Sequence, residues 1–189
     1  MEIFDELNQL LEKKEITKND LQDILRTYSK TIGVYDQMLA CEELKADNHY
    51  LPQEYAEKFS AVYIKSFVMR INDIKNNKEN LKGTIPHDDM EEAVHLFKYN
   101  FDLDKEDRRP DDKFPLIYVL ISLYTTFIIE EPIHPEGTPF PGDLEVIKEN
   151  DKYLCPVKDA QLESPNAVCK ICIAENLDHR TTIWNHIQY

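Results

Sequence analysis

Glycine is scarce in this chain, with 4 glycines among 189 residues. A doubly wound nucleotide-binding fold needs glycine-rich turns between strand and helix, and the sequence contains neither G-x-G-x-x-G nor G-x-x-x-x-G-K. The apolar fraction of 42%, which includes 8 Phe and 10 Tyr, is large enough to build a core. We therefore expect a mainly α-helical protein that forms one structural domain overall.

Apolar residues recur at helical spacing through the first 130 residues, which predicts a multi-helix array. Thr17 and Asp20 resemble a capping box at the start of a helix, and Gly33 is expected to break that helix. Pro52 suits the first turn of a long helix, and Pro86 the start of another. These apolar stripes are typical of core faces rather than of cofactor contacts.

The longest apolar run, residues 114–129, has 16 residues and several hydroxyl side chains. It is shorter than the roughly 20 residues of a membrane span, so we expect a buried central helix. The N-terminus carries acids early and no apolar run, unlike a signal peptide. We expect a cytoplasmic protein that does not bind membranes.

The character of the sequence changes at Glu131. The segment EPIHPEGTPFPGD holds four of the ten prolines and two of the four glycines, so it cannot continue a helix. We expect a helical domain over residues 1–131 and a small irregular C-terminal module over residues 132–189 that packs on it. Such a module has little core of its own, and a metal ion would supply the missing cross-link.

Alternating residues from Leu144 onward predict a short β-hairpin within this module. The strands would turn at Asn150 and Asp151 and deliver Cys155 at the end of the second strand.

Three of the four cysteines fall within eighteen residues, at Cys155, Cys169 and Cys172. A Cys-x-x-Cys pair lets both sulfurs turn toward one ion. His134, held in a proline-flanked loop of the same module, is the preferred fourth ligand. The sequence therefore predicts a metal site made by His134, Cys155, Cys169 and Cys172, with zinc as the favoured metal and a structural role.

Other ligands and other chemistries stay open. His179, His186 and Cys41 are alternative fourth ligands, although six residues separate His179 from Cys172 and Cys41 sits on an apolar helix face. An iron–sulfur cluster is the alternative cofactor. A redox pair lacks the surrounding βαβ pattern, and a disulfide between Cys169 and Cys172 leaves Cys155 unexplained.

Two further site readings fit poorly. His134 and Glu136 followed by Cys-x-x-Cys imitate a zinc deaminase, but Val168 stands where that signature has proline, and Cys155 is surplus. Residues 102–112 alternate acids like a calcium loop but lack its glycine and its final glutamate.

The sequence therefore favours a non-enzymatic binding or assembly protein whose partner is another protein. It shows no nucleophile, acid–base or phosphate-binding set outside the cysteine cluster, and Lys158, Asp159 and Gln161 could form part of the partner surface. The net charge of −14 disfavours nucleic acid and anionic membrane as partners because both are polyanions. A metalloenzyme using the same His/Cys cluster is the alternative.

The C-terminal motifs EPIHPEGTPFPG, CPVKDAQ and NAVCKICIAE resemble, in that order, an uncharacterised protein family of methanogenic archaea. The resemblance runs over most of the chain, with all specific motifs between Glu131 and Glu175. Asp143 and Leu154 depart from the family pattern, and neither is a proposed ligand. The resemblance implies a cytosolic setting and that the His134 and cysteine motifs belong together, but it implies no reaction.

Overall fold

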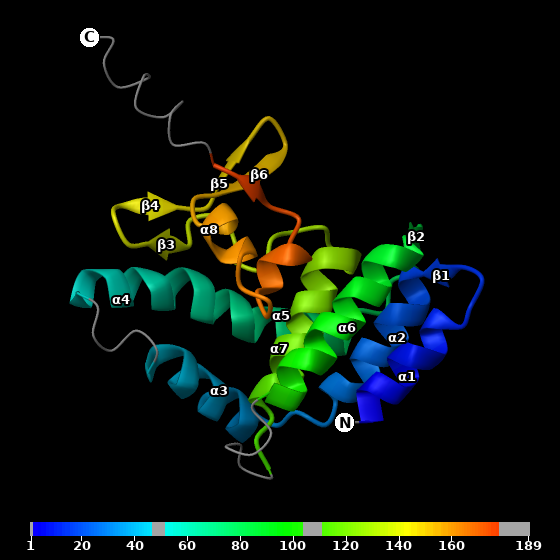
Figure 1. Ribbon diagram of the computed structural model, residues 1–189. Coiled ribbons are helices and arrows are strands. Elements are labelled where there is room, and N and C mark those ends of the chain that lie inside the picture. Colours follow the sequence, from blue (N-terminus) through cyan, green and yellow to red (C-terminus); the bar gives the residue numbers. More distant parts are fainter. Residues whose placement is uncertain (1, 47–51, 104–110, 178–189) are drawn as a thin grey trace.

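The computed structural model describes residues 2–46, 52–103 and 111–177, and it is mainly helical (Figure 1). The helices are α1 (Glu2–Leu11), α2 (Lys18–Ser29), α3 (Val34–Ala46), α4 (Gln53–Phe59), α5 (Lys65–Asn76), α6 (His87–Leu103), α7 (Phe114–Leu123) and α8 (Lys158–Leu162). Two π-helical turns, η1 (Ser60–Ile64) and η2 (Tyr124–Ile128), and one 3₁₀ turn, η3 (Val168–Lys170), extend this set. None of the described helices is long and apolar enough to cross a bilayer.

Helix α7 forms the centre of the helical part. It contacts α2, α3, α5 and α6, and most of its side chains are buried. This confirms the expected buried central helix in the run that begins at Phe114. The run ends in η2, and Glu130 follows with a positive φ of 53°, so the helix stops where the proline-rich segment begins.

Segments α4, η1 and α5 form one continuous helix, which confirms the predicted long helix; Pro52 lies at its N-cap, one residue before the predicted first turn. The π turn in its middle was not predicted, because an extra residue in one turn leaves little trace in an apolar pattern. Tyr63 lies in this turn and its ring packs at a tilt against that of His134, with ring centroids 4.7 Å apart. The turn therefore contributes to the surroundings of a predicted ligand.

The capping box at α2 is confirmed. The Thr17 hydroxyl accepts from the Asp20 backbone N–H, and the Asp20 carboxylate accepts from the Thr17 backbone N–H. Two-residue strands that no pattern predicted, β1 (Ile16–Thr17) and β2 (Thr84–Ile85), pair antiparallel just before α2 and α6.

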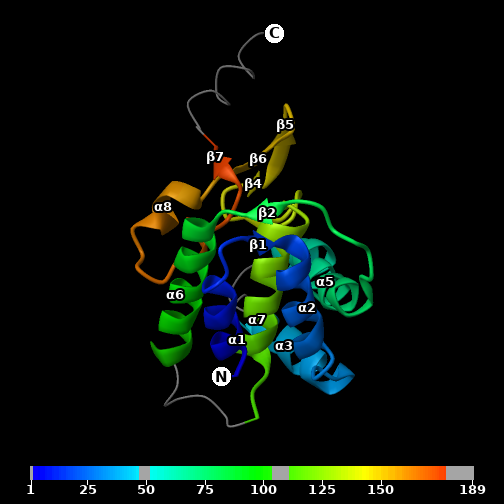
Figure 2. The same ribbon diagram turned by 90° about the vertical axis from the view of Figure 1, so that its right-hand side faces the viewer.

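The C-terminal elements are short strands and turns at one end of the helical part, visible in two views (Figures 1 and 2). The strands are β3 (Pro139–Phe140), β4 (Leu144–Glu145), β5 (Ile147–Glu149), β6 (Lys152–Cys155) and β7 (Glu175–Asn176). Strand β3 pairs antiparallel with β4, β5 pairs antiparallel with β6, and β6 pairs parallel with β7.

The predicted hairpin is confirmed in its turn and its end. Asn150 and Asp151 have positive φ values of 49° and 62°, as a two-residue turn requires, and Cys155 ends β6. The predicted first strand is wrong at its start, because Leu144 pairs with Phe140 and the hairpin begins at Ile147. Strand β7 and helix α8 were not predicted.

The C-terminal elements bury little of their own. Val146, Cys155 and Ala174 form a small cluster apart from the main core, while Val168 and Ile171 pack against the helices. The division at residues 131 and 132 and the fastening of this part by a metal stay predictions.

We predict that Thr17→Ala lowers the free energy of unfolding by about 1 kcal/mol, because the first turn of α2 loses its side-chain acceptor. Denaturant unfolding measures the change. Thr27→Ala on the exposed face of α2 is the matched control and should be near neutral, because its hydroxyl only bonds the Asp23 carbonyl within the helix. Equal losses in the two variants would contradict the capping account.

Candidate metal centre

All four predicted ligands line one cavity. His134, Cys155, Cys169 and Cys172 surround a volume of about 10 Å³ beneath the C-terminal elements. Such a volume is close to that of a single water-sized occupant. Most of the remaining wall is apolar: Pro132, Ile133, Val146, Val168 and Ala174. The fold thus brings together residues that are up to 38 positions apart in the sequence, from His134 to Cys172.

Cys155 is placed by the hairpin, as the last residue of β6, and is buried. Burial raises the pKa of its thiol, whereas hydrogen bonds from the backbone N–H groups of Val157 and Lys158 lower it. On balance the pKa of Cys155 is raised, and the two backbone donors only partly offset burial; they would support the thiolate, the form that binds metal.

Cys169 and Cys172 lie on either side of the end of η3. The Cys172 N–H donates to the Val168 carbonyl at 3.2 Å, which folds the Cys-x-x-Cys segment into a tight turn. Burial and the neighbouring Cys172 and Cys155 raise the pKa of Cys169 to about 11, while Lys158 opposes the shift. A bound cation would reverse this balance, because it stabilises the closely spaced thiolates.

His134 is held between two aromatic rings. Its centroid lies 4.7 Å from that of Tyr63 and 5.5 Å from that of Phe140. Burial, and then the charge of Arg70, lower its pKa to about 4. The imidazole is therefore neutral at neutral pH, as a metal ligand must be.

Arg70 holds the loop that carries His134. This buried side chain of α5 donates to the Ile133 carbonyl at 2.7 Å and the Pro132 carbonyl at 3.0 Å, and its guanidinium lies 3.3 Å from the Glu131 carboxylate. Sequence reasoning missed Arg70, because one arginine on a helix face carries no signal of what it contacts.

Lys158 faces the cysteines. Its ammonium donates to the Cys172 carbonyl at 2.8 Å and also to the Ala174 carbonyl. Lys158 is partly buried, while Asp159 and Gln161 are exposed, and the suggestion that the three contribute to a partner surface stays a prediction. The position of Lys158, three residues after Cys155, was the one sequence signal that could have placed it near the cysteines.

The alternative fourth ligands are placed as follows. Cys41 packs against the main core from α3 and does not line the cavity, and burial raises the pKa of its thiol. His179 and His186 lie outside the described residues. Glu136, the proton shuttle of the deaminase reading, is exposed and does not line the cavity.

The ligand atoms surround the cavity loosely. A tetrahedral zinc site with zinc–sulfur bonds of about 2.3 Å holds its sulfurs roughly 4 Å apart. Among the described residues, one group of three or more His, Cys, Asp or Glu side chains has all its ligand atoms within 4.8 Å of one another: His87, Asp88 and Glu91. The four cavity residues do not form such a group. The group at the start of α6 is exposed, and exposed acidic groups of this kind are common in proteins that bind no metal there. The four cavity residues would have to move closer together to bind an ion.

The comparisons with known proteins agree on one family. A family model described as "Uncharacterized protein conserved in archaea (DUF2115)" matches residues 17–177. Two UPF0305 proteins of Methanothermobacter thermautotrophicus are 31% and 34% identical to this chain, over 84% and 79% of its length and 96% and 90% of theirs. A UPF0305 protein of Methanocaldococcus jannaschii is 26% identical, over 84% of this chain and 96% of its own. No solved structure matches the chain significantly.

We predict that Arg70→Met lowers the free energy of unfolding by about 3 kcal/mol, because two buried carbonyls lose their donor. Chemical denaturation of the metal-free protein measures this directly. Lys65→Met, an exposed change on the same helix, should cost less than about 0.5 kcal/mol. A loss from Arg70→Met no larger than from Lys65→Met would exclude the proposed anchoring of the His134 loop.

The depressed pKa of His134 predicts a pH dependence of stability. Since the pKa is about 6.5 unfolded and about 4 folded, the unfolded chain binds a proton first as pH falls. The contribution is therefore fully present above pH 6.5, is lost progressively toward pH 4, and amounts to at most about 3 kcal/mol. Because carboxylates titrate in the same range, the measurement is the difference in unfolding free energy between the wild type and His134→Gln, with a chelator present. A difference that stays constant from pH 7 to pH 4 would contradict the partly buried, neutral imidazole.

Proposed function

The chain belongs to the family of uncharacterized proteins conserved in archaea, as its resemblance to a family of methanogens led us to expect, and we propose that it binds one zinc ion as a structural centre. The proposed ligands are His134, Cys155, Cys169 and Cys172. The single observation that carries the proposal is their shared cavity of about 10 Å³.

The donor set favours zinc over other metals. Three thiolates and one imidazole form a common tetrahedral zinc environment, whereas magnesium and calcium prefer oxygen ligands. The cavity also has room for one ion rather than for a multi-atom cluster, which favours zinc over the iron–sulfur alternative.

Four protein ligands fill a tetrahedron and leave no position for a reacting water, so we assign the ion a structural role. It would join three segments: the loop after η2, the end of the β5–β6 hairpin, and the turn at η3. The buried cluster beside it contains just Val146, Cys155 and Ala174 among the described residues. A bound ion would stabilise this part of the fold, because so few apolar contacts contribute little to its stability.

The surroundings of the four residues support the same assignment. Arg70 fixes the backbone before His134, and Lys158 brings one positive charge to a set with a formal charge of −1 when zinc is bound to three thiolates. Opposite charges in a half-buried site offset each other's cost of desolvation.

The wider role we propose is that of a non-enzymatic binding or assembly factor of the archaeal cytoplasm with a protein partner. One observation supports a protein partner: α3 exposes the apolar residues Val34, Tyr35 and Met38 to solvent. Apolar side chains gathered on one exposed helix face are typical of protein contacts.

We predict that the protein purified without added metal carries about one equivalent of zinc and lacks absorbance near ~400 nm. Elemental analysis measures the metal. Cys169→Ser and His134→Ala should each reduce zinc below roughly half an equivalent and lower the melting temperature, because a ligand is lost. Cys41→Ser is the matched control and should retain the zinc, since Cys41 lies outside the cavity.

Less than roughly half an equivalent of zinc in the wild type, with iron also absent, would exclude the site. A brown protein that contains iron would support the iron–sulfur cluster instead of zinc. If His134→Ala retained both its zinc and its melting temperature, His134 would not be the fourth ligand.

A further inference from the structure

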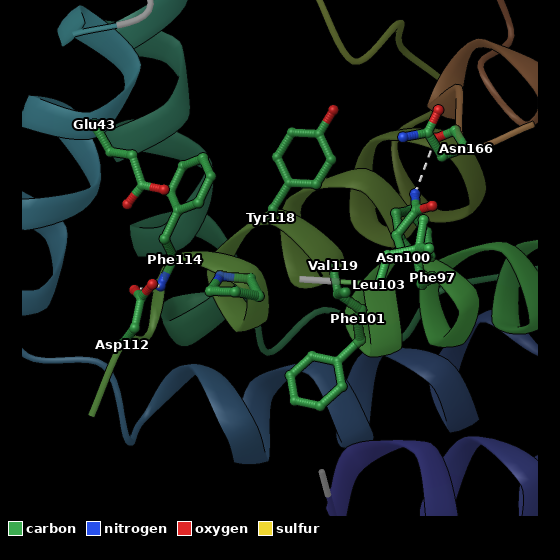
Figure 3. Close-up of a pocket in the computed structure, with 11 residues that line it drawn as sticks. Glu43, Phe97, Asn100, Phe101, Leu103, Asp112, Phe114, Tyr118, Val119 and Asn166 are labelled. Atoms are coloured by element: carbon green, nitrogen blue, oxygen red, sulfur yellow. Dashed lines mark hydrogen bonds between the residues drawn. The ribbon is translucent and has the colours of Figure 1, made fainter. Parts of the chain in front are cut away.

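The Cys-x-x-Cys turn is fastened to the helical part on its N-terminal side. The Asn100 amide nitrogen on α6 donates to the Asn166 carbonyl at 2.9 Å, and both residues line a cavity between α3, α6 and α7 (Figure 3). Asn166 stands three residues before Cys169, and Val168 packs against the main core. The helices therefore position the start of the turn that carries Cys169.

Lys158 joins the other side of this turn to the segment that follows Cys155. It is the first residue of α8, and its ammonium donates to the Cys172 carbonyl at 2.8 Å and to the Ala174 carbonyl. Its backbone N–H donates a hydrogen bond to the Cys155 sulfur. Lys158 thus contacts both segments that carry the cysteines, and these contacts exist before any ion is bound.

The charge of Lys158 lies beside the thiols that would bind the ion. Among the described residues that line the metal cavity, it is the one with a formal charge at neutral pH. Burial is the largest cause of the shift in the pKa of both Cys155 and Cys169 and raises it, whereas the charge of Lys158 lowers it. Three thiolates that share a partly buried cavity repel one another, so a positive charge held next to them favours the set.

We propose that Lys158 is a positioning residue of the metal centre, which holds the two cysteine segments together and offsets the charge of their thiolates. This inference rests on the proposed zinc site, and it assigns to that site a determinant of affinity outside the four ligands. Replacement of such outer residues typically lowers metal affinity by roughly 10- to 100-fold. A lysine suits both tasks, because its ammonium carries a charge and has three N–H donors and no acceptor.

The zinc affinity of the full chain, measured by competition with a chromophoric chelator, tests the proposal. We expect Lys158→Met to weaken zinc binding by at least about tenfold, because the side chain keeps most of its length but loses its donors and its charge. Lys158→Arg should recover most of this loss, since it restores both. Lys152→Met is the matched control: it removes the same charge from an exposed side chain of β6 that pairs with Glu175 and does not line the cavity, and it should leave the affinity unchanged.

Cobalt(II) bound in place of zinc separates the effect of the charge from an effect on folding. A positive charge beside a thiolate stabilises the electrons of the sulfur, so the sulfur-to-cobalt charge-transfer band moves to shorter wavelength. We expect this band to lie at longer wavelength in Lys158→Met than in the wild type, and Lys158→Arg to restore it. A merely structural role of Lys158 would weaken binding without moving the band.

The outcomes distinguish this inference from the zinc site itself. If the wild type bound zinc and Lys158→Met matched it in affinity and in the cobalt band, the inference would be overturned and the zinc site would stand. A wild type that bound no zinc would exclude both. Equal losses in Lys158→Met and Lys152→Met would show that overall charge sets the affinity, against the proposal. If Lys158→Met failed to fold, as judged by its melting curve, the cobalt band of Lys158→Gln, which keeps an N–H donor without the charge, would decide.

Discussion

The anchoring of residues 131–133 by Arg70 is the interaction on which the C-terminal arrangement depends. The central helix stops at η2, and the proline-rich chain that follows cannot continue the helical hydrogen bonds. Arg70 supplies donors to two consecutive carbonyls of that chain from the middle of α5. A buried guanidinium is costly unless its donors are used, so the loop and the arginine stabilise each other. This contact sets where His134 lies, and with it one side of the cavity that the cysteines complete.

The helices were predictable because their signals are local. The capping residues Thr17 and Asp20, the break at Gly33 and the prolines at 52 and 86 each act on neighbouring residues, and the structure places helix boundaries at all of them. The turn at Asn150 and Asp151 was predictable for the same reason, since both residues tolerate positive φ. What failed depends on distant pairing: β7 and β1 are two residues long, and no periodicity can reveal so short a strand.

The candidate site also has a part that the sequence predicts and a part that it does not. Cysteine spacing and a proline-flanked histidine identified residues that line one cavity, because ligand types are few and their spacing is chemically restricted. Arg70, Tyr63 and Lys158 were not assigned to it, because their part is to position or to balance charge, and many residue types can do that elsewhere in a sequence.

The parallel pairing of β6 with β7 has a consequence for the order in which the chain matures. Strand β6 reaches its partner by way of α8 and η3, and the Leu177 N–H donates to the Cys155 carbonyl at 3.0 Å. On the ribosome the helices through η2 emerge before β7, so their core can form while the three cysteines are still unconnected. The proposed ion would then enter only after Cys172 has emerged, and it would join a C-terminal part to helices that are already folded.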